Sequence, residues 1–207
     1  MRIYLVRHGE SEGNRTKVFQ DPKSPLSSDG QKQAEAVAKR FNGVKIDVIL
    51  ASPYTRADMT AQAISRSLRV KVEHWNDLHE IKRPTELIGK SIHSREAKLF
   101  EKHLINSVHN SEASYSGEEG FEDLKARAQK ILEHLIKNHK GQNILLVSHA
   151  TTIKSIVFQA ILGDNLNSKL FWNIRRHIVT KNTGVTILEY SKNRGWALVT
   201  WGDTSHL

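Results

Sequence analysis

The sequence predicts an α/β protein in which a mostly parallel sheet is covered by helices on both faces. Short apolar runs alternate with amphipathic stretches along most of the chain, which is the pattern of strand–helix–strand units. The chain has 207 residues, 38% of them hydrophobic, which suits a single domain, residues 1–207, with a packed core. No apolar run approaches the roughly 18 residues that span a bilayer, and the start, MRIYLVRHGE, does not resemble a signal peptide. We therefore expect a cytoplasmic protein without a membrane partner.

The first half of the chain supplies three expected strands and two expected helices. Ile3–Val6 and Ile46–Leu50 are apolar enough for buried strands, and Val70–Val72 is a shorter third strand. Leu26–Gly43 is expected to be a helix because serines can cap its start, apolar residues follow at helical spacing and a glycine ends it. The second helix is expected over about Tyr54–Leu68.

The second half repeats the alternation and then ends in a hairpin. Asn143–Val147 is the fourth expected strand, and a helix over about Thr151–Leu162 follows it. Val185–Tyr190 and Trp196–Trp201 are expected to be two further strands, joined by a turn at Lys192–Gly195.

Residues 76–120 interrupt this alternation. They are polar, contain Pro84 and several glycines, and include one expected helix around Ser94–Val108. We expect an insertion that lies over the sheet rather than a separate domain.

Cationic and imidazole side chains follow three of the expected strands. Arg7 and His8 end the first strand, Arg56 lies shortly after the second, and His149 ends the fourth. Because parallel α/β sheets bind ligands at the carboxyl ends of their strands, these four side chains are expected to meet at one edge. Clustered cations need an anion to offset their repulsion and desolvation. A phosphate group fits, since a guanidinium binds two of its oxygens at once.

A histidine in such a pocket can act as a nucleophile. Neutral imidazole attacks phosphorus, and its ordinary pKa of about 6.5 leaves it largely unprotonated at pH 7. The other histidine would hydrogen-bond the transferring oxygens, and the arginines would match the charge of the transition state. A carboxylic acid must protonate the leaving alkoxide and later activate water. Glu80, within the insertion, is the expected proton donor.

The composition excludes several other chemistries. The chain has no cysteine, which excludes a disulfide framework, a thiolate nucleophile and a cysteine metal site. The remaining histidines lack the spacing of metal ligands; His134 and His139, for example, lie five residues apart on an expected helix. We therefore expect no metal site.

The formal net charge is +9, and residues 169–194 contribute six Lys or Arg against one Glu. We favour a solvated basic face for this stretch. A mouth that attracts phosphorylated substrate and a polyanion-binding patch are the alternatives. Aromatic residues are not interleaved at stacking spacing, so a nucleic-acid partner is disfavoured.

Five segments of the chain carry a family pattern. They are LVRHGESEGN, SPLSSDGQKQA, ASPYTRADMTAQ, VSHATTIKSIV and the final GDTSHL. Together they span nearly the full chain and resemble the histidine phosphatase superfamily, the group that includes cofactor-dependent phosphoglycerate mutases. The resemblance implies a three-layer α/β/α sandwich with one antiparallel edge strand, and a reaction that needs no metal.

The resemblance also implies a role for individual residues. His8 would be the phosphorylated nucleophile, and Glu80 would be the proton donor. A phosphate pocket around the nucleophile is implied for Arg7, Arg56, His149, Asn14 and, less directly, Ser11.

Departures from the family pattern favour a phosphatase over a mutase. Family mutases carry Glu-Arg-His-Tyr-Gly around the acid, whereas Ile81, Lys82 and Arg83 follow it here, and the chain is shorter than typical mutases. Glu119 replaces a common Ser and is expected to alter the pocket rim. We expect a phosphomonoester hydrolase of the histidine acid phosphatase type. A cofactor-dependent phosphoglycerate mutase and a non-catalytic phosphate- or polyanion-binding protein are the alternatives.

The expected partner is a small phosphorylated substrate, and no cofactor is expected. Lys82 and Arg83 are available to bind a second anionic group on that substrate. Sugar phosphates, phosphorylated acids, nucleotides and phosphoproteins all remain open, as does the oligomeric state, with a homodimer among the options.

Overall fold

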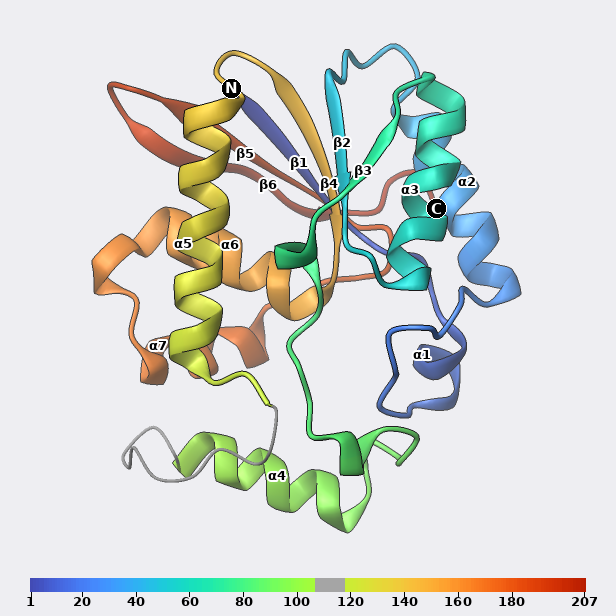
Figure 1. The fold of residues 1–207 in the computed structure, drawn as a ribbon, viewed down its shortest axis with the longest axis vertical. Helices are drawn as coiled ribbons and strands as arrows, with labels where there is room; N and C mark the ends of the chain where they lie inside the picture. The colour runs from blue at the N-terminus through green and yellow to red at the C-terminus, as the bar shows by residue number, and fades with distance from the viewer. Residues whose placement is uncertain (107–117) are drawn as a thin grey trace.

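The computed structural model describes residues 1–106 and 118–207, and a six-stranded sheet forms the centre of this described part (Figure 1). The strand order across the sheet is β3-β2-β4-β1-β5-β6. The strands are β1 (Arg2–Arg7), β2 (Val48–Ala51), β3 (Val72–His74), β4 (Asn143–Ser148), β5 (Val185–Ser191) and β6 (Gly195–Asp203).

The sheet is parallel except at one edge. β1 pairs with β4, β4 with β2 and β2 with β3, all in parallel. β5 runs antiparallel to β1, and β6 runs antiparallel to β5. The expected mostly parallel sheet with an antiparallel edge is therefore confirmed, with the β5–β6 hairpin as that edge.

Helices cover both faces of this sheet, and others lie beyond the end at which β1 finishes (Figure 1). They are α1 (Glu12–Thr16), α2 (Ser28–Arg40), α3 (Thr55–Leu68), α4 (Arg95–Asn106), α5 (Phe121–Asn138), α6 (Ala150–Leu162) and α7 (Ser168–His177). Short 3₁₀ turns are η1 (Asn76–Leu78), η2 (Thr85–Leu87) and η3 (Gly163–Asn165). α2 and α3 lie on one side of the sheet and α5 and α6 on the other, which gives the expected three-layer sandwich (Figure 1).

The central strands bury side chains on both faces because their sequences are apolar at almost every position. In β1, Ile3 and Leu5 belong to the core shared with α5, α6 and α7. Tyr4 and Val6, which alternate with them, belong to the core shared with α2 and α3. This double burial fixes the register of β1 and therefore the position of the residues that follow it.

Two glycines allow the loop after β1 to lie directly against the start of α2. A Cβ on Gly30 would lie 1.8 Å from the backbone oxygen of Glu10, and a Cβ on Gly9 would lie 2.4 Å from the backbone oxygen of Gly30. Ser27 caps α2 by accepting a hydrogen bond from the Gly30 N–H (3.0 Å). Its own N–H donates to the Glu10 oxygen (2.9 Å). The loop that contains His8 is therefore held tightly against a helix terminus.

The insertion contributes η1, η2 and α4, and α4 lies at the lower end of the molecule in Figure 1, beyond the end at which β1 finishes. The helix expected around Ser94–Val108 is present as α4. Val108 lies outside the described residues.

The basic stretch 169–194 contains α7, a helix that the sequence analysis did not predict. Asn167 caps it by accepting from the Leu170 N–H (3.0 Å), and Phe171 and Trp172 are buried. Phe171 and Ile174 lie three residues apart, a helical spacing that the prediction overlooked, and both pack in the core shared with α5 and α6.

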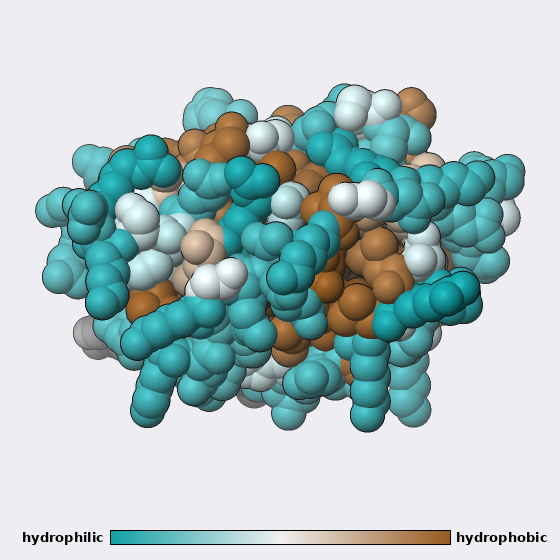
Figure 2. Space-filling model, turned by 90° about the horizontal axis from the view of Figure 1, so that it is seen from above, coloured by the Kyte–Doolittle hydropathy of each residue, from teal (hydrophilic) through white to brown (hydrophobic). Residues whose placement is uncertain are grey.

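The end of the molecule at which β1 begins is mostly hydrophilic. Figure 2 views this end and shows teal side chains around a brown apolar hollow. Within the part of the chain that the structure describes, no helix has the length and apolar character needed to cross a bilayer.

Candidate active site

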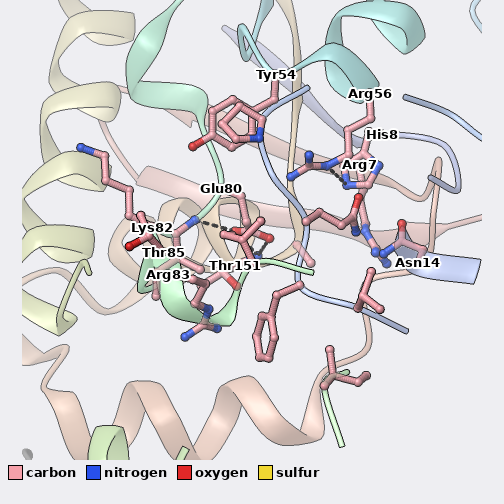
Figure 3. A pocket seen from close by; sticks show the side chains of 18 of the residues that line it. Arg7, His8, Asn14, Tyr54, Arg56, Glu80, Lys82, Arg83, Thr85 and Thr151 are labelled. Carbon is pink, nitrogen blue, oxygen red and sulfur yellow. Dashed lines mark hydrogen bonds between the residues drawn. The ribbon is translucent and has the colours of Figure 1, made fainter. Parts of the chain in front are cut away.

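A cavity of about 580 Å³ opens at the carboxyl ends of the central strands (Figure 3). Loops after β1, β2 and β4, the insertion and α7 all contribute to it. Its polar and charged lining includes Arg7, His8, Asn14, Tyr54, Arg56, Glu80, Lys82, Arg83, Thr151 and Arg175. The volume is in the range of small-molecule sites.

His8 is buried, and its tautomer follows from its contacts. Its Nδ1 lies 2.6 Å from the Gly9 carbonyl oxygen, which can only accept, so Nδ1 carries the proton. Nε2 accepts a hydrogen bond from Arg56 Nε (3.3 Å). Burial, followed by the charges of Arg56 and Arg7, holds the pKa of His8 well below its usual 6.5. The imidazole is therefore neutral at pH 7, with its lone pair on Nε2.

Two guanidinium groups flank this imidazole. Arg56, which also lies 5.2 Å from the Tyr54 ring centroid, donates to the Asp21 backbone oxygen (3.1 Å). Arg7 donates to the Thr180 backbone oxygen (2.6 Å), and its buried Nε has no hydrogen-bond partner among the described residues. Burial lowers the pKa of both groups, but a guanidinium is so strongly basic that both stay charged at neutral pH. Two buried cations with donors to spare form a site for an anion.

His149 lies beside His8 rather than on the cavity surface. Its ring centroid is 5.0 Å from that of His8, it is fully buried, and its Nε2 lies 2.9 Å from Ser52 Oγ. Burial, together with Arg56, holds its pKa well below 6.5. Its Nδ1 is buried with no partner among the described residues. This unpaired nitrogen is able to hydrogen-bond a ligand that is bound next to His8.

Glu80 follows η1 and lines the cavity beside the start of α6. Its Oε1 accepts from the Ile81 N–H (2.9 Å), and both carboxyl oxygens lie near the Thr151 N–H (3.2 and 3.3 Å). The N–H groups of a first helical turn have no partner within the helix, so the Thr151 N–H is available to hold the Glu80 carboxyl group in place. In Figure 3 Glu80 lies between the His8–Arg56 pair and Lys82. The acid is thus brought to the same cavity as the nucleophile candidate.

Asn14 presents its amide nitrogen for a ligand. Its Oδ1 lies 3.3 Å from the Ser11 backbone N–H and 3.3 Å from Asn182 Nδ2. Asn182 Nδ2 also donates to the His8 backbone oxygen (3.0 Å). Because a backbone N–H can only donate and a carbonyl only accept, both amide orientations are fixed. The Nδ2 group of Asn14 is left for a ligand, and Asn14 lines the cavity.

Ser11 contributes through Asn14. It is fully buried, caps α1 and lies outside the cavity lining. Sequence reasoning missed Asn182, which approaches from the segment before β5. The antiparallel pairing of β5 with β1 brings it to the loop that contains His8.

Lys82 and Arg83 line the cavity, as do residues that the sequence did not single out. The Lys82 side chain extends away from His8 in Figure 3, and the Arg83 guanidinium lies 5.5 Å from the Phe100 ring centroid. Arg175 comes from α7. Lys154 on α6 donates to the Arg175 backbone oxygen (2.9 Å), and burial lowers the pKa of this lysine to about 8.

A buried ion pair holds the segment that carries Glu80. Arg127 Nε and Nη2 donate to the two carboxyl oxygens of Glu119 (3.0 and 2.9 Å). Its Nη1 donates to the backbone oxygens of Asp77 and His79 (both 2.8 Å), and Glu119 accepts from the Lys82 N–H (2.9 Å). Glu119 therefore belongs to the ion pair that holds this segment. It lies outside the cavity lining, not at the pocket rim where the sequence analysis expected it.

In the described ranges, no group of three or more His, Asp or Glu side chains has an arrangement that could hold a metal ion.

With two histidines, two arginines and a carboxylate at the strand ends of this α/β/α sandwich, the family can be assigned. The chain belongs to the histidine phosphatase superfamily, branch 1, whose family model matches residues 3–204. It is similar to the probable phosphoglycerate mutase GpmB of Salmonella choleraesuis (strain SC-B67), with 28% identity over 214 aligned residues. The alignment covers 100% of this chain and 95% of that relative.

Solved structures share the fold. A phosphoserine phosphatase from Entamoeba histolytica, in complex with phosphoserine, superimposes with a TM-score of 0.83 and 23% identity, covering 100% of this chain and 98% of the other. YhfR from Bacillus stearothermophilus gives a TM-score of 0.83 and 24% identity, covering 99% and 98%. A putative α-ribazole-5′-phosphate phosphatase from Escherichia coli gives 0.82 and 21%, covering 98% and 96%.

Proposed function

We propose that the protein is a phosphomonoester hydrolase that works through a phosphohistidine on His8. The observation that carries the proposal is the neutral imidazole of His8, whose Nε2 lone pair lies next to two buried guanidinium groups. That arrangement combines a nucleophile with a binding site for a phosphate group.

When the phosphate group binds, the Arg56 Nε–H would donate to a phosphate oxygen instead of to His8 Nε2. In the first step, His8 Nε2 then forms a bond to phosphorus while the bond between phosphorus and the ester oxygen breaks. Arg7 and Arg56 bind the oxygens of the transferring group, and the Asn14 amide and His149 Nδ1 supply further hydrogen bonds. Glu80, entering the step as a carboxylic acid, gives its proton to the departing alkoxide. The alcohol leaves and the phosphoryl group stays on His8.

In the second step, a water molecule attacks the phosphohistidine. The Glu80 carboxylate takes a proton from that water, the N–P bond breaks, and inorganic phosphate is released. His8 and Glu80 return to their starting protonation states, so the cycle balances without a metal ion.

The test is phosphate release from a panel of phosphorylated metabolites by the wild-type protein and His8→Ala. The variant is expected to lose several orders of magnitude in kcat, because the covalent route is removed. The wild-type protein should also form a phosphoenzyme that is stable to base and labile to acid. Turnover without a label on His8 would refute the proposal.

Glu80→Gln tests the proton donor separately. A p-nitrophenolate leaving group needs no protonation, whereas an alkoxide does. Because kcat/KM reports the step in which the alcohol leaves, the variant should lose at least a hundredfold more kcat/KM on an alkyl phosphate than on p-nitrophenyl phosphate. An equal loss on both esters would argue that Glu80 has another role.

A phosphoglycerate mutase is the second candidate, and the similarity to GpmB, a probable phosphoglycerate mutase, favours it. It requires a bisphosphorylated primer and isomer exchange that is faster than phosphate release. Release without exchange, with or without the primer, would eliminate it. A non-catalytic phosphate- or polyanion-binding protein would instead bind in a salt-dependent manner that His8→Ala does not change.

A further inference from the structure

One side of the cavity is apolar, in contrast to the cluster of cations around His8. Val18, Phe19, Ile88 and Ile92 line it there, and we call these four residues the apolar wall. Ile88 is 37% exposed and Ile92 is 44% exposed. Exposed isoleucines gathered at the mouth of a polar site indicate contact with an apolar ligand.

The backbone holds this wall in place. Residues 18–19 and 88–92 are far apart in the sequence, but bridges pair Val18 with Ser91 and Phe19 with Ile88. The Phe19 N–H donates to the Lys90 oxygen (3.0 Å), and the Gly89 N–H donates to the Phe19 oxygen (2.8 Å). The apolar wall is therefore preformed, which reduces the entropy cost of binding a ligand against it.

The cations nearest to this wall have apolar partners or extend elsewhere. The Arg83 guanidinium stacks over Phe100, Arg175 stacks over Trp172 at 5.2 Å, and the Lys82 side chain extends away from His8 (Figure 3). Stacking does not remove the charge of a guanidinium, so the preference for an apolar group rests on the apolar wall, and the test must include substrates with a second anionic group.

Accepting the proposed function, on which this inference rests, we propose that the apolar wall binds the body of the leaving alcohol. The substrate class is then a monophosphate ester of an alcohol that carries an alkyl chain or ring of several carbons. Arg7, Arg56 and His8 would bind its phosphate, and the apolar wall would set its specificity.

The test is a series of ethyl, butyl and hexyl monophosphates, whose alcohols are similarly acidic and therefore demand the same chemistry. Each fully buried methylene is worth roughly fourfold in kcat/KM. Because the wall is partly open, we expect a rise of about tenfold or more from ethyl to hexyl. Phosphoserine and 3-phosphoglycerate serve as comparisons that carry a second anionic group.

Variants locate the effect. Ile92→Ser should reduce the hexyl-to-ethyl ratio of kcat/KM by about threefold or more, and Ile88→Ser should act in the same direction. Ile161→Ser is the matched control, because Ile161 is 49% exposed at the far end of α6, outside the cavity lining. This control should leave the ratio unchanged.

A flat alkyl series, or a higher kcat/KM for either phosphorylated acid than for hexyl phosphate, would overturn the inference. Either result would leave the proposed function standing if release still depends on His8. Failure of the proposed function would be distinct, because no ester would then be hydrolysed in a His8-dependent manner. A ratio unchanged in Ile92→Ser and Ile88→Ser would also overturn it.

Discussion

A single carbonyl oxygen decides which nitrogen of His8 can react. The Gly9 oxygen accepts from Nδ1 (2.6 Å), so the lone pair is on Nε2, where Arg56 also points. The same loop is fixed from the other side, since Asn182 donates to the His8 backbone oxygen. Nucleophile and phosphate-binding groups are therefore oriented by backbone atoms, which do not depend on side-chain rotamers.

Asn182 is expected to position the site without touching the substrate. In Asn182→Asp, an oxygen would face the His8 oxygen and Asn14 Oδ1, so a hydrogen bond would become a repulsion. Loss of one such bond, about 1.5 kcal/mol, should reduce kcat/KM about tenfold or more. Phosphate release measures it, and Asn193→Asp makes the same change in the exposed turn before β6. Equal kinetics in both variants would contradict the assignment.

At the scale of elements, the active site depends on contacts between segments that are distant in the sequence. The ion pair between Arg127 on α5 and Glu119 holds backbone groups on both sides of Glu80. Such a buried pair is weak evidence for stability by itself. The geometry of the ion pair instead holds the backbone around Glu80, and proton transfer from Glu80 requires its position to be fixed to within a fraction of an ångström.

Arg127→Lys should therefore resemble a mild form of Glu80→Gln. Lysine cannot donate to Glu119 in two places and also reach two backbone oxygens. We expect the rate on alkyl phosphates to fall about tenfold more than the rate on p-nitrophenyl phosphate, measured side by side. Arg66→Lys, on the exposed surface of α3, is the matched control. If Arg127→Lys slows both esters equally, the ion pair has a general structural role instead.

The close contact between the His8 loop and α2 is expected to be sensitive to substitution at Gly30. In Gly30→Ala the new methyl group would meet the Glu10 backbone oxygen at 1.8 Å, so the loop or the helix must move. Overpacking of this kind costs about 2–3 kcal/mol in the free energy of unfolding, and it should also reduce kcat. Urea denaturation and phosphate release measure the two effects. Glu35→Ala, exposed in the same helix, should change neither much.

At the scale of the whole molecule, stability is expected to depend on pH through the buried histidines. The folded-state pKa values of His8 and His149 lie well below 6.5 because both imidazoles are buried beside arginines. The unfolded chain therefore binds more protons as the pH falls below 6.5. The contribution of the two histidines to stability is complete above about pH 6.5 and is lost towards lower pH. For each histidine, the folding equilibrium constant falls by up to roughly tenfold for each pH unit.

Urea denaturation between pH 5 and pH 8 tests this. The wild-type free energy of unfolding should fall below pH 6.5, and the slope should be smaller in His8→Asn, which removes one titrating group. His93→Asn alters an exposed histidine and should keep the wild-type slope. A slope that His8→Asn does not reduce would mean that the imidazole is protonated in the folded protein.

The sequence predicted the central sheet and the main charged residues because both depend on local patterns. Arg7, His8 and His149 follow apolar strands directly, and parallel strands place their carboxyl ends together. Asn182 and the Arg127–Glu119 pair could not be predicted in this way, since their partners are reached only through strand pairing and helix packing. α7 could have been predicted, because Phe171, Ile174 and Ile178 follow helical spacing; the basic residues around them favoured a solvated face instead.

The place of β1 in the sheet also limits how the protein can be made. β1 is synthesised before its partners β4 and β5, which begin at Asn143 and Val185. In the nascent chain this apolar segment therefore has no strand to pair with until β4 has been made. A prematurely terminated polypeptide would contain the histidine but not its surroundings, and its unpaired first strand would be a site for aggregation.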